Sequence, residues 1–479
     1  MNYKVIIHTL GWVLGFEGIS MIFPLICSVC YGESQIVRTF AICIAICLAL
    51  GITFTRFASK KRDMYAKEGF MIVGLSWIVM SIFGALPFVI SGSIPNFIDA
   101  LFETASGFTT TGASILSDVE ALPKGIVFWR SFTHWIGGMG VLVFLVSILP
   151  LSGGNNFYMM KAESQGPAVG KIVPRVKTTA KILYEIYTVF TIIQIVLLLA
   201  GGMSLFDSIT TAFGTAGTGG FGIRNSSMGE YSTYIQNVIT IFMIVFGVDF
   251  SMYYLLLIRR GKDVLRSEEV RGYLGIIVVS TLFITFNVLG MYDSFGEALK
   301  HSAFQVASII TTTGFSTTNF DLWPEFSKTI LVVLMFIGAC AGSTGGGIKV
   351  SRVIIMLKSV VKTLKMSAHP KSTHKITMNG RAIEHETIRG VNVFIISYLA
   401  IFVLSLLIIS LDNFDFTTNF TAITSMINNI GPGLAKVGPM ENFAKFSQIS
   451  KIVFVFDMLA GRLGIFPILI LFSSYTWKK

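Results

Sequence analysis

Apolar residues in this chain gather in long runs instead of alternating with polar ones. Runs of about 20 apolar residues are long enough to cross the hydrocarbon core of a bilayer as helices. Ten such runs are predicted, at residues 3–30, 36–58, 69–91, 126–151, 181–203, 235–258, 272–293, 326–342, 391–411 and 449–474. The pattern therefore predicts an all-α protein that crosses a membrane several times.

The links between these runs alternate in charge. One set is basic and includes Lys60–Arg62, the residues Lys161, Lys171 and Arg175, and the long stretch Lys349–Arg389. The other set is acidic or mixed. Because basic links stay on the cytoplasmic side of a membrane, the pattern predicts that both termini are cytoplasmic, which agrees with an even number of spans.

Four of the acidic links resemble one another. They read DALFETASGFTTTGAS from Asp99, DSITTAFGTAGTGGFG from Asp207, EALKHSAFQVASIITTTGFSTT from Glu297 and DFTTNFTAITSMINNIGPGL from Asp415. Each begins with an acidic residue, continues as a short helical stretch and ends in a turn centred on Gly112, Gly219, Gly314 or Gly431. Because self-similarity at a fixed period indicates a repeat architecture, the sequence predicts four units, each a span, a short helix, a glycine turn and a second span.

The repeat also predicts the organisation of the chain. An N-terminal region of two transmembrane helices at residues 1–66 precedes unit 1 at 67–165, unit 2 at 166–265, unit 3 at 266–385 and unit 4 at 386–479.

Four glycine turns of this kind favour an ion pore. Irregular backbone at membrane depth is tolerated only where protein buries it or where it lines a water-filled cavity. Backbone and threonine oxygens can replace the hydration shell of a monovalent cation, and the C-terminal end of a short helix carries partial negative charge. The alternative is a set of ordinary outer loops, but four related segments at corresponding places favour the pore.

Composition narrows the function classes further. Charged residues make up 13% of the chain and apolar residues 53%, whereas a soluble domain carries about 25% charged residues. This composition excludes a disordered chain and a soluble enzyme. The net charge of +11 falls in short links, so nucleic-acid binding is not favoured.

Reactive side chains do not form a recognisable centre in the sequence. Cys27 and Cys30 form a CxxC pair, but no βαβ pattern surrounds them, and we interpret them as small hydrophobic residues. The six histidines show no metal-ligand spacing. A membrane-embedded enzyme would need convergent titratable residues, which the spans do not offer, and we predict that the protein is not an enzyme.

Several motifs together resemble one family. They are SGFTTTGAS, WIGGMG at Trp135–Gly140, TTTGFSTTNFDLWP at Thr311–Pro324, GSTGGGIKVSR at Gly342–Arg352, INNIGPGL at Ile427–Leu434 and GRLGIFP at Gly461–Pro467. Over nearly its whole length the chain resembles the bacterial Trk/Ktr potassium-uptake proteins of the Trk/Ktr/HKT superfamily. The two extra N-terminal spans favour the TrkH-type branch over the shorter Ktr branch.

The resemblance implies four fused M1–P–M2 units in the inner membrane, with potassium as the transported ion and no organic cofactor. It also implies a homodimer and a cytosolic nucleotide-binding ring subunit, TrkA, as partner. It places a selectivity filter at Thr110, Thr111, Gly112, Gly217, Thr218, Gly219, Thr312, Thr313, Gly314, Asn429, Ile430 and Gly431. Since the segments are unequal and none contains TVGYG, fewer ion sites and lower selectivity than in a tetrameric potassium channel are expected.

A second glycine-rich segment follows the eighth span. Dense glycine breaks a helix, at roughly 1 kcal/mol per residue relative to alanine. The resemblance makes this segment an intramembrane gating loop, formed by Gly342, Ser343, Thr344, Gly345, Gly346 and Gly347. The alternative is a close-packed interface between helices with small residues.

Arg462 stands in the last span between apolar stretches. In the family an arginine at this motif faces the pore and acts with the gating loop, and the alternative is an ion pair with Asp457. The chain has Gly464 where the family motif has glutamate, so the partner of Arg462 is open. Asp249 stands where the family more often has asparagine, and Glu17 is interpreted as a packing residue.

Two further alternatives concern function. The basic stretch Lys349–Arg389 is interpreted either as a docking surface for the ring subunit or as plain positive-inside topology. A carrier that couples cation movement to sodium or protons by alternating access would show inverted repeats and paired broken helices. Here the four repeats share one orientation and only one span is strongly broken in the sequence, which favours a potassium-conducting pore subunit.

Overall fold

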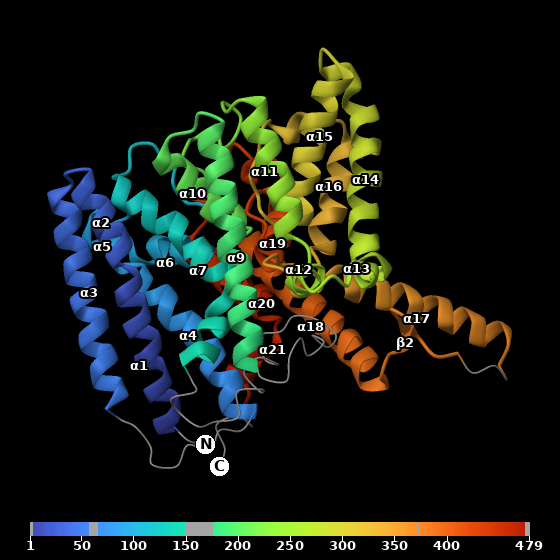
Figure 1. Cartoon of the computed structure of the whole chain (residues 1–479), viewed down its shortest axis with the longest axis horizontal. Helices are drawn as coiled ribbons and strands as arrows, with labels where there is room; N and C mark the ends of the chain where they lie inside the picture. The colour runs from blue at the N-terminus through green and yellow to red at the C-terminus, as the bar shows by residue number, and fades with distance from the viewer. Residues whose placement is uncertain (1–2, 57–65, 149–175, 371–373, 475–479) are drawn as a thin grey trace.

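The structure is a computed structural model that describes residues 3–56, 66–148, 176–370 and 374–474. The predicted basic residues Lys60–Arg62, Lys161, Lys171 and Arg175 lie outside the described residues. The described chain is almost entirely helical (Figure 1).

The N-terminal region consists of α1 (Tyr3–Ser20), α2 (Ile22–Cys30) and α3 (Ser34–Thr55). Small residues bring α1 and α3 together: a Cβ on Gly11 would lie 2.8 Å from the carbonyl oxygen of Gly51. Close approach at small residues is a common way for membrane helices to pack, because burial against lipid-like side chains gives little driving force.

The first two repeat units follow. Unit 1 contains α4 (Ala66–Gly84), α5 (Leu86–Ile90), α6 (Phe97–Phe108) and α7 (Lys124–Ile148). Unit 2 contains α9 (Val176–Ala200), α10 (Leu205–Ala216), α11 (Thr233–Phe246), α12 (Phe250–Leu257) and α13 (Gly261–Arg266).

Units 3 and 4 repeat the same order of elements. Unit 3 contains α14 (Glu268–Val288), η2 (Leu289–Met291), α15 (Phe295–Ile310), η3 (Phe320–Leu322), α16 (Glu325–Ile337) and α17 (Val350–Ala368). The hairpin of β1 (Thr377–Met378) and β2 (Arg381–Ala382) leads to α18 (His385–Ile409), η4 (Ser410–Asp412), α19 (Phe416–Asn428), η5 (Ala435–Val437), α20 (Gln448–Leu463) and α21 (Phe466–Phe472). Helix α17, in orange, projects away from the body of the molecule (Figure 1).

The short helices α6, α10, α15 and α19 each begin at a polar cap. The caps are Asn96, Ser204, Ser294 and Asp415, whose side chains accept hydrogen bonds from backbone N–H groups of the first turn. In the first three helices the predicted acidic residue stands in the first turn instead of at the cap. Both arrangements place negative charge where the helix dipole favours it.

Six helical segments in the described residues are long and apolar enough to cross a membrane. They are Tyr3–Cys30, Ser34–Thr55, Glu68–Ile90, Ala180–Ala200, Glu268–Met291 and His385–Asp412. A seventh candidate is the pair α11 and α12, which is bent by 90°.

The second spans of all four units are interrupted. Helix α7 has a non-helical residue at Gly140, α11 and α12 are separate helices, α16 ends at Gly338, and α20 is separated from α21 at Gly464. The expectation that only one span is strongly broken is therefore wrong. Glycines with φ near +70° stand at the breaks in units 1, 3 and 4. Outside a dense glycine run such as Gly345–Gly347, a glycine in an apolar stretch is a weak sequence signal.

Candidate functional site

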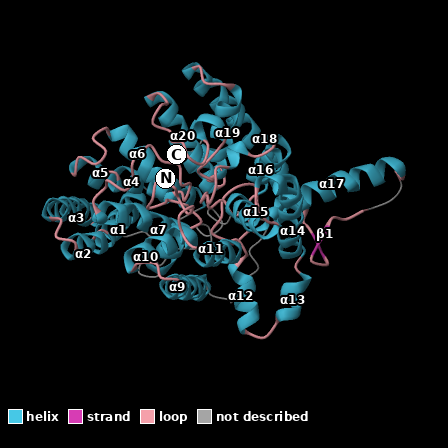
Figure 2. Ribbon diagram, turned by 90° about the horizontal axis from the view of Figure 1, so that it is seen from above, coloured by secondary structure: helices cyan, strands magenta, loops and turns pink. Residues whose placement is uncertain are grey.

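The glycine turns of the four units meet at the centre of the molecule, where loops gather inside a ring of helices (Figure 2). Each turn contains a glycine whose added Cβ would lie less than 3.0 Å from a carbonyl oxygen of the next unit. These contacts run from Gly112 to Gly219, from Gly220 to Thr313, from Gly314 to Ile430 and from Gly431 to Thr111. Because the last contact leads back to the first unit, the four segments form a closed ring.

Backbone conformation repeats around this ring. Two residues before each of these glycines stands a non-glycine residue in the left-handed region: Thr110 (φ 54°), Thr218 (φ 53°), Thr312 (φ 59°) and Asn429 (φ 56°). Residues with a Cβ rarely adopt such angles, and when several do they mark a specialised site.

In unit 2 the ring differs by one residue from the sequence-based assignment. The geometric counterparts of Thr110, Thr111 and Gly112 are Thr218, Gly219 and Gly220, because Gly220 has φ 73° whereas Gly217 is a helix C-cap with φ −70°. The segment TAGTGG offers three glycines, and only backbone geometry fixes which of them closes the turn.

Hydrogen bonds support this register. The backbone N–H of the middle residue donates to a carbonyl five residues earlier in every unit: Thr111 to Ser106 (2.9 Å), Gly219 to Gly214 (2.8 Å), Thr313 to Ser308 (2.8 Å) and Ile430 to Ser425 (3.0 Å). The segments are thus held in one conformation by the ends of their own short helices.

Side chains connect some of these segments directly. The hydroxyls of Thr109 and Thr111 lie 2.8 Å apart in unit 1, and those of Thr311 and Thr313 lie 2.7 Å apart in unit 3. The Asn429 side-chain amide of unit 4 donates to the Thr111 hydroxyl at 2.9 Å. The ring is therefore chemically asymmetric although its backbone is repeated.

A buried ion pair within unit 1 lies next to unit 2. The Arg130 Nε donates to Glu103 at 2.6 Å, and both side chains are at most 3% exposed. Another Arg130 nitrogen donates to the Gly222 carbonyl at 2.9 Å, and the guanidinium lies 3.5 Å from the centre of the Phe221 ring. Breaking a buried pair leaves an uncompensated charge, so Glu103 holds the Arg130 guanidinium in place. The contacts of Arg130 with Gly222 and Phe221 then join unit 1 to unit 2.

His134 makes a second connection at the same place. Its Nδ1 lies 2.7 Å from the Gly107 carbonyl, and its Nε2 accepts a hydrogen bond from the Phe221 N–H at 3.2 Å. Sequence reasoning missed both this histidine and the Glu103–Arg130 pair. The available signal was charged and polar residues inside otherwise apolar stretches, which are usually functional or paired.

The loops that follow the glycine turns, here called the outer loops, are joined between neighbouring units by hydrogen bonds that backbone N–H groups donate. Val119 N–H donates to the Asn225 side chain (2.9 Å), Met228 N–H to Ser316 (2.8 Å), Ala435 N–H to Asp321 (3.0 Å) and Phe443 N–H to Ser114 (2.9 Å). Asn225 also donates to Asp118, which lowers the pKa of that carboxyl below its usual value. The lowered pKa keeps the Asp118 carboxyl ionised at neutral pH.

The predicted gating loop lies against the ring. Gly346 N–H donates to the Thr312 hydroxyl at 2.7 Å, which joins the loop to the unit 3 segment. Cys340 N–H donates to the Gly247 carbonyl at 3.0 Å, and the Gly342 carbonyl accepts from Phe250 N–H at 3.1 Å. These two contacts seat the loop on the bend between α11 and α12.

Arg462 also contacts this loop. Its guanidinium donates to the Thr344 carbonyl at 2.6 Å and to the carbonyls of Gly137 and Gly138 on α7. Asp457 instead accepts a hydrogen bond from the Ser405 hydroxyl at 2.8 Å. The structure therefore brings Arg462 together with the loop, whereas Asp457 faces α18.

Backbone conformation explains why the chain has glycine at position 464, where the family motif has glutamate. Gly464 is the C-cap of α20 with φ 74° and ψ 32°. This left-handed conformation suits glycine at a helix end, and it produces the interruption before α21.

The carboxylates of Asp249 and Glu17 lie at a helix cap and in the packed interior, respectively. Asp249 caps α12 by accepting from Ser251 N–H at 2.9 Å. Glu17 is fully buried beside Gly84, where an added Cβ would lie 2.9 Å from its Oε1. All five cysteines are free thiols.

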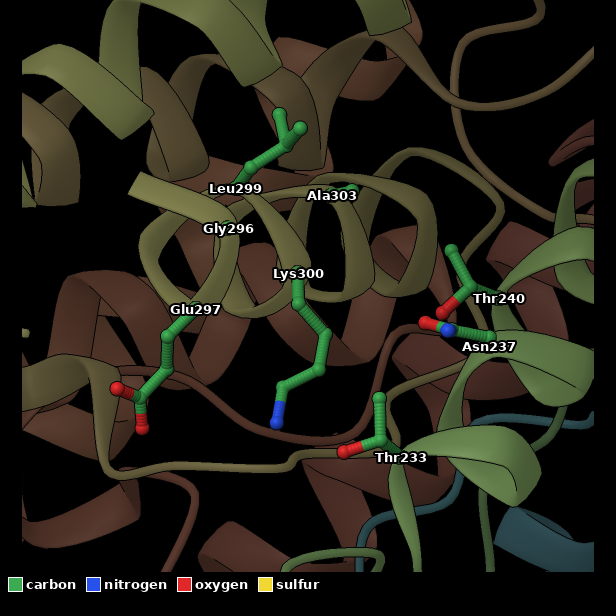
Figure 3. Close-up of a pocket in the computed structure, with 8 residues that line it drawn as sticks. All are labelled: Thr233, Asn237, Thr240, Gly296, Glu297, Leu299, Lys300 and Ala303. Carbon is green, nitrogen blue, oxygen red and sulfur yellow. The ribbon is translucent and has the colours of Figure 1, made fainter. Parts of the chain in front are cut away.

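A separate hollow lies between α11 and α15, away from the ring. It has a volume of about 640 Å³, and Thr233, Asn237, Glu297 and Lys300 direct polar side chains toward it (Figure 3). None of its lining residues belongs to the predicted filter or loop. Within the part of the chain that the structure describes, no group of three or more His, Cys, Asp or Glu side chains is arranged to hold a metal ion.

Two N-terminal membrane spans, followed by four units with short helices around one axis, define a class of protein. This is the class of multi-pass membrane proteins built from four fused M1–P–M2 units.

Comparison with known proteins identifies the family. Residues 32–478 match the TrkH family, described as cation transport proteins. The chain is 36% identical to the Trk system potassium uptake protein TrkH of Salmonella typhimurium, with 100% of both chains covered. It is 31% identical to TrkG of Escherichia coli, covering 100% of this chain and 99% of the relative.

A solved structure agrees with this result. The crystal structure of the potassium transporter TrkH from Vibrio parahaemolyticus matches with a TM-score of 0.89 and 33% identity over 100% of both chains. The chain belongs to the TrkH family of cation transport proteins, a family of membrane transporters and not of enzymes.

Proposed function

We propose that this protein is the potassium-conducting pore subunit of a bacterial potassium-uptake system. The closed ring of four glycine turns carries this proposal. Backbone carbonyls gathered around one axis can substitute for the hydration shell of a potassium ion. Relatives that match over full length are potassium uptake proteins by name.

The ion ligands we propose are backbone carbonyls of the ring segments. Their middle residues are Thr111, Gly219, Thr313 and Ile430. A bare charge in apolar surroundings costs tens of kcal/mol by Born estimates, so a rigid set of oxygens is needed to admit the ion. The four segments differ in side chains, and we expect weaker discrimination against sodium than in a symmetric tetrameric channel.

The gate we propose is the loop Gly342–Gly347 together with Arg462. The loop lies directly against the Thr312 hydroxyl, so its position determines access to the ring from one side. A fixed guanidinium next to the path repels potassium and limits leak. Movement of the loop would open access to the ring and would break the hydrogen bond between Arg462 and the Thr344 carbonyl.

The proposed assembly is a homodimer in the inner membrane with both termini cytoplasmic. Its proposed partner is a TrkA-type nucleotide-binding ring that docks on α17. This helix carries Lys358, Lys362 and Lys365 together with the strongly exposed Leu357 and Leu364. Exposed apolar side chains next to basic ones are typical of a surface that binds another protein.

A second candidate is a cation carrier with alternating access. The interruptions in the second spans of all four units favour it, because discontinuous helices are common in carriers. Saturating flux that strictly requires a sodium or proton gradient would distinguish this carrier from a pore.

The proposal is tested by rubidium uptake into proteoliposomes that contain the purified full chain. We expect uptake driven by the membrane potential alone, with potassium competing better than sodium. Equal competition by sodium and potassium, or absence of uptake without a second ion gradient, would contradict the pore.

A further inference from the structure

One buried carboxylate joins the two ends of the predicted gating loop. The Glu269 Oε1 accepts hydrogen bonds from the backbone N–H of Ala341 at 2.7 Å and of Ser351 at 3.0 Å. Ala341 stands where the loop begins, and Ser351 lies in the first turn of α17 where the loop has ended. Glu269 is 9% exposed, so its carboxylate is largely withdrawn from solvent.

This arrangement matters because the loop has little regular structure of its own. The buried ammonium of Lys349, the residue just before α17, donates to the Gly345 carbonyl of the loop. Dense glycine leaves the backbone free to change shape. A carboxylate that accepts two backbone N–H groups makes strong, charge-assisted bonds. Glu269 therefore fixes the separation between the ends of a segment that is otherwise easily deformed.

The neighbouring residue, Glu268, connects the start of α14 to α17 and to the β1–β2 hairpin. Glu268 pairs with Lys358 of α17 and accepts from the Asn379 N–H, in the turn between β1 and β2, at 2.9 Å. Lys358 also donates to the Thr377 carbonyl at 2.7 Å. The Asn379 side chain in turn accepts from the Glu268 N–H at 2.8 Å.

Two adjacent glutamates at the start of α14 thus face two different partners. We propose that Glu269 is a positioning residue that holds the gating loop closed through its two hydrogen bonds. We propose also that Glu268 couples these bonds to α17 and the β1–β2 hairpin. A displacement of α17 or of the hairpin would shift the first turn of α14 and release both ends of the loop. The inference rests on the proposed function, since it assigns a role to the proposed gate.

A cysteine next to the start of the loop can report on its opening. Cys340 adjoins Ala341 and is 0% exposed. Reaction with N-ethylmaleimide, followed by mass spectrometry of the Cys340 peptide, measures how often the loop opens. Cys43 and Cys47 are equally buried, between α1 and α3, and serve as internal controls in the same molecule.

The first test compares Glu269→Ala with Glu269→Gln in the purified full chain. Loss of a hydrogen bond to a charged group changes an equilibrium by about tenfold or more, so Glu269→Ala is expected to raise both the Cys340 labelling rate and basal rubidium flux about tenfold. Glu269→Gln keeps an amide oxygen that accepts the same N–H groups and is expected to stay within a few-fold of wild type. If Glu269→Ala does not fold, Glu269→Asp, which is one methylene too short to reach both N–H groups, is expected to raise labelling in the same direction.

The second test addresses Glu268. Glu268→Lys is expected to raise Cys340 labelling less than Glu269→Ala does, and the charge exchange Glu268→Lys with Lys358→Glu is expected to restore protection. Asp263→Ala, which removes an exposed ion pair with Arg260 on nearby α13, serves as the control and should change nothing.

If Cys340 is labelled at the wild-type rate in both Glu269→Ala and Glu269→Asp, the claim that Glu269 holds the loop closed is wrong. Failure of the charge exchange to restore protection would overturn the coupling through Glu268. If the wild-type protein conducts no rubidium, the proposed function fails, while the labelling result still decides whether Glu269 holds the loop.

Discussion

At the scale of single residues, the space around each ring glycine determines whether a larger side chain can replace it. A Cβ on Gly112 or Gly314 would strike a carbonyl of the next unit, and both residues have positive φ. Gly92 has a similar φ of 77° but nothing within 4 Å of its Cβ position. A substitution at Gly92 therefore tests the effect of positive φ alone, whereas a substitution at Gly112 or Gly314 also tests crowding at the ring.

Substitution of Gly112 or Gly314 by serine is expected to relax discrimination between potassium and sodium. The added atoms displace the carbonyl of the neighbouring segment, which alters the geometry of the proposed ion site. Sodium competition against rubidium uptake measures the effect. Gly92→Ser is the matched control and should keep wild-type selectivity. Unchanged selectivity in both ring variants would show that these glycines do not shape the filter.

Arg462→Ala is expected to raise rubidium flux about tenfold, because hydrogen bonds from a charged group to the loop carbonyl are lost. Removal of the positive charge acts in the same direction. Arg224→Ala is the control, since Arg224 pairs with Glu230 near the outer loops. Flux that stays at the wild-type level in folded Arg462→Ala protein would contradict a gating role.

At this scale, explicit motifs in the sequence indicated which segments are structurally equivalent, and the ion-binding role of these segments stays a prediction. Thr110–Gly112, Thr312–Gly314 and Asn429–Gly431 occupy equivalent places in the ring. In unit 2 the several glycines left the register ambiguous by one residue. The pairing of Glu103 with Arg130 depends on contacts between distant segments, which a single sequence does not reveal.

At the scale of elements, the short helices are stabilised by their caps. Asp415 accepts hydrogen bonds from Thr418 N–H at 2.9 Å and from the Thr418 hydroxyl at 2.5 Å. These bonds lower the pKa of the Asp415 carboxyl below its ordinary value. A carboxyl whose pKa is lower in the folded state stabilises the fold at pH values above its unfolded pKa and loses this effect as the pH falls through its folded pKa.

Asp415→Ala is accordingly expected to cost about 1 kcal/mol near neutral pH, the usual cost of losing an N-cap. The difference from wild type should shrink as the pH falls below about 4. Thermal unfolding in detergent at several pH values measures it, and Asp415→Asn should retain most of the stability because asparagine also caps helices. A pH-independent deficit in Asp415→Ala would mean that the cap is not the cause.

Element positions followed well from the sequence, but their interruptions did not. Of the ten predicted runs, six correspond in the described residues to helical segments long and apolar enough to cross a membrane, and a seventh corresponds to the bent pair α11 and α12. Acidic residues indicated the starts of the short helices. The breaks at Gly140 and Gly464 depend on how each second span packs beneath the ring. One glycine in an apolar helix costs only about 1 kcal/mol, which tertiary contacts easily override.

At the scale of the whole molecule, four unequal units within one chain reproduce a fourfold arrangement. A closed ring requires that every unit contact two neighbours, and both the ring and the outer loops satisfy this requirement. The period in the sequence was sufficient to predict this architecture. The direction in which α17 projects was not predictable, because an amphipathic helix can lie on the body or extend from it.

The most direct test of the account is the position of bound rubidium in a crystal of this protein, located by anomalous scattering. We predict density on the central axis, surrounded by the segments that contain Thr111, Gly219, Thr313 and Ile430. Rubidium bound only elsewhere, with none between these four segments at saturating concentration, would contradict the claim that the ring is the ion-selective site.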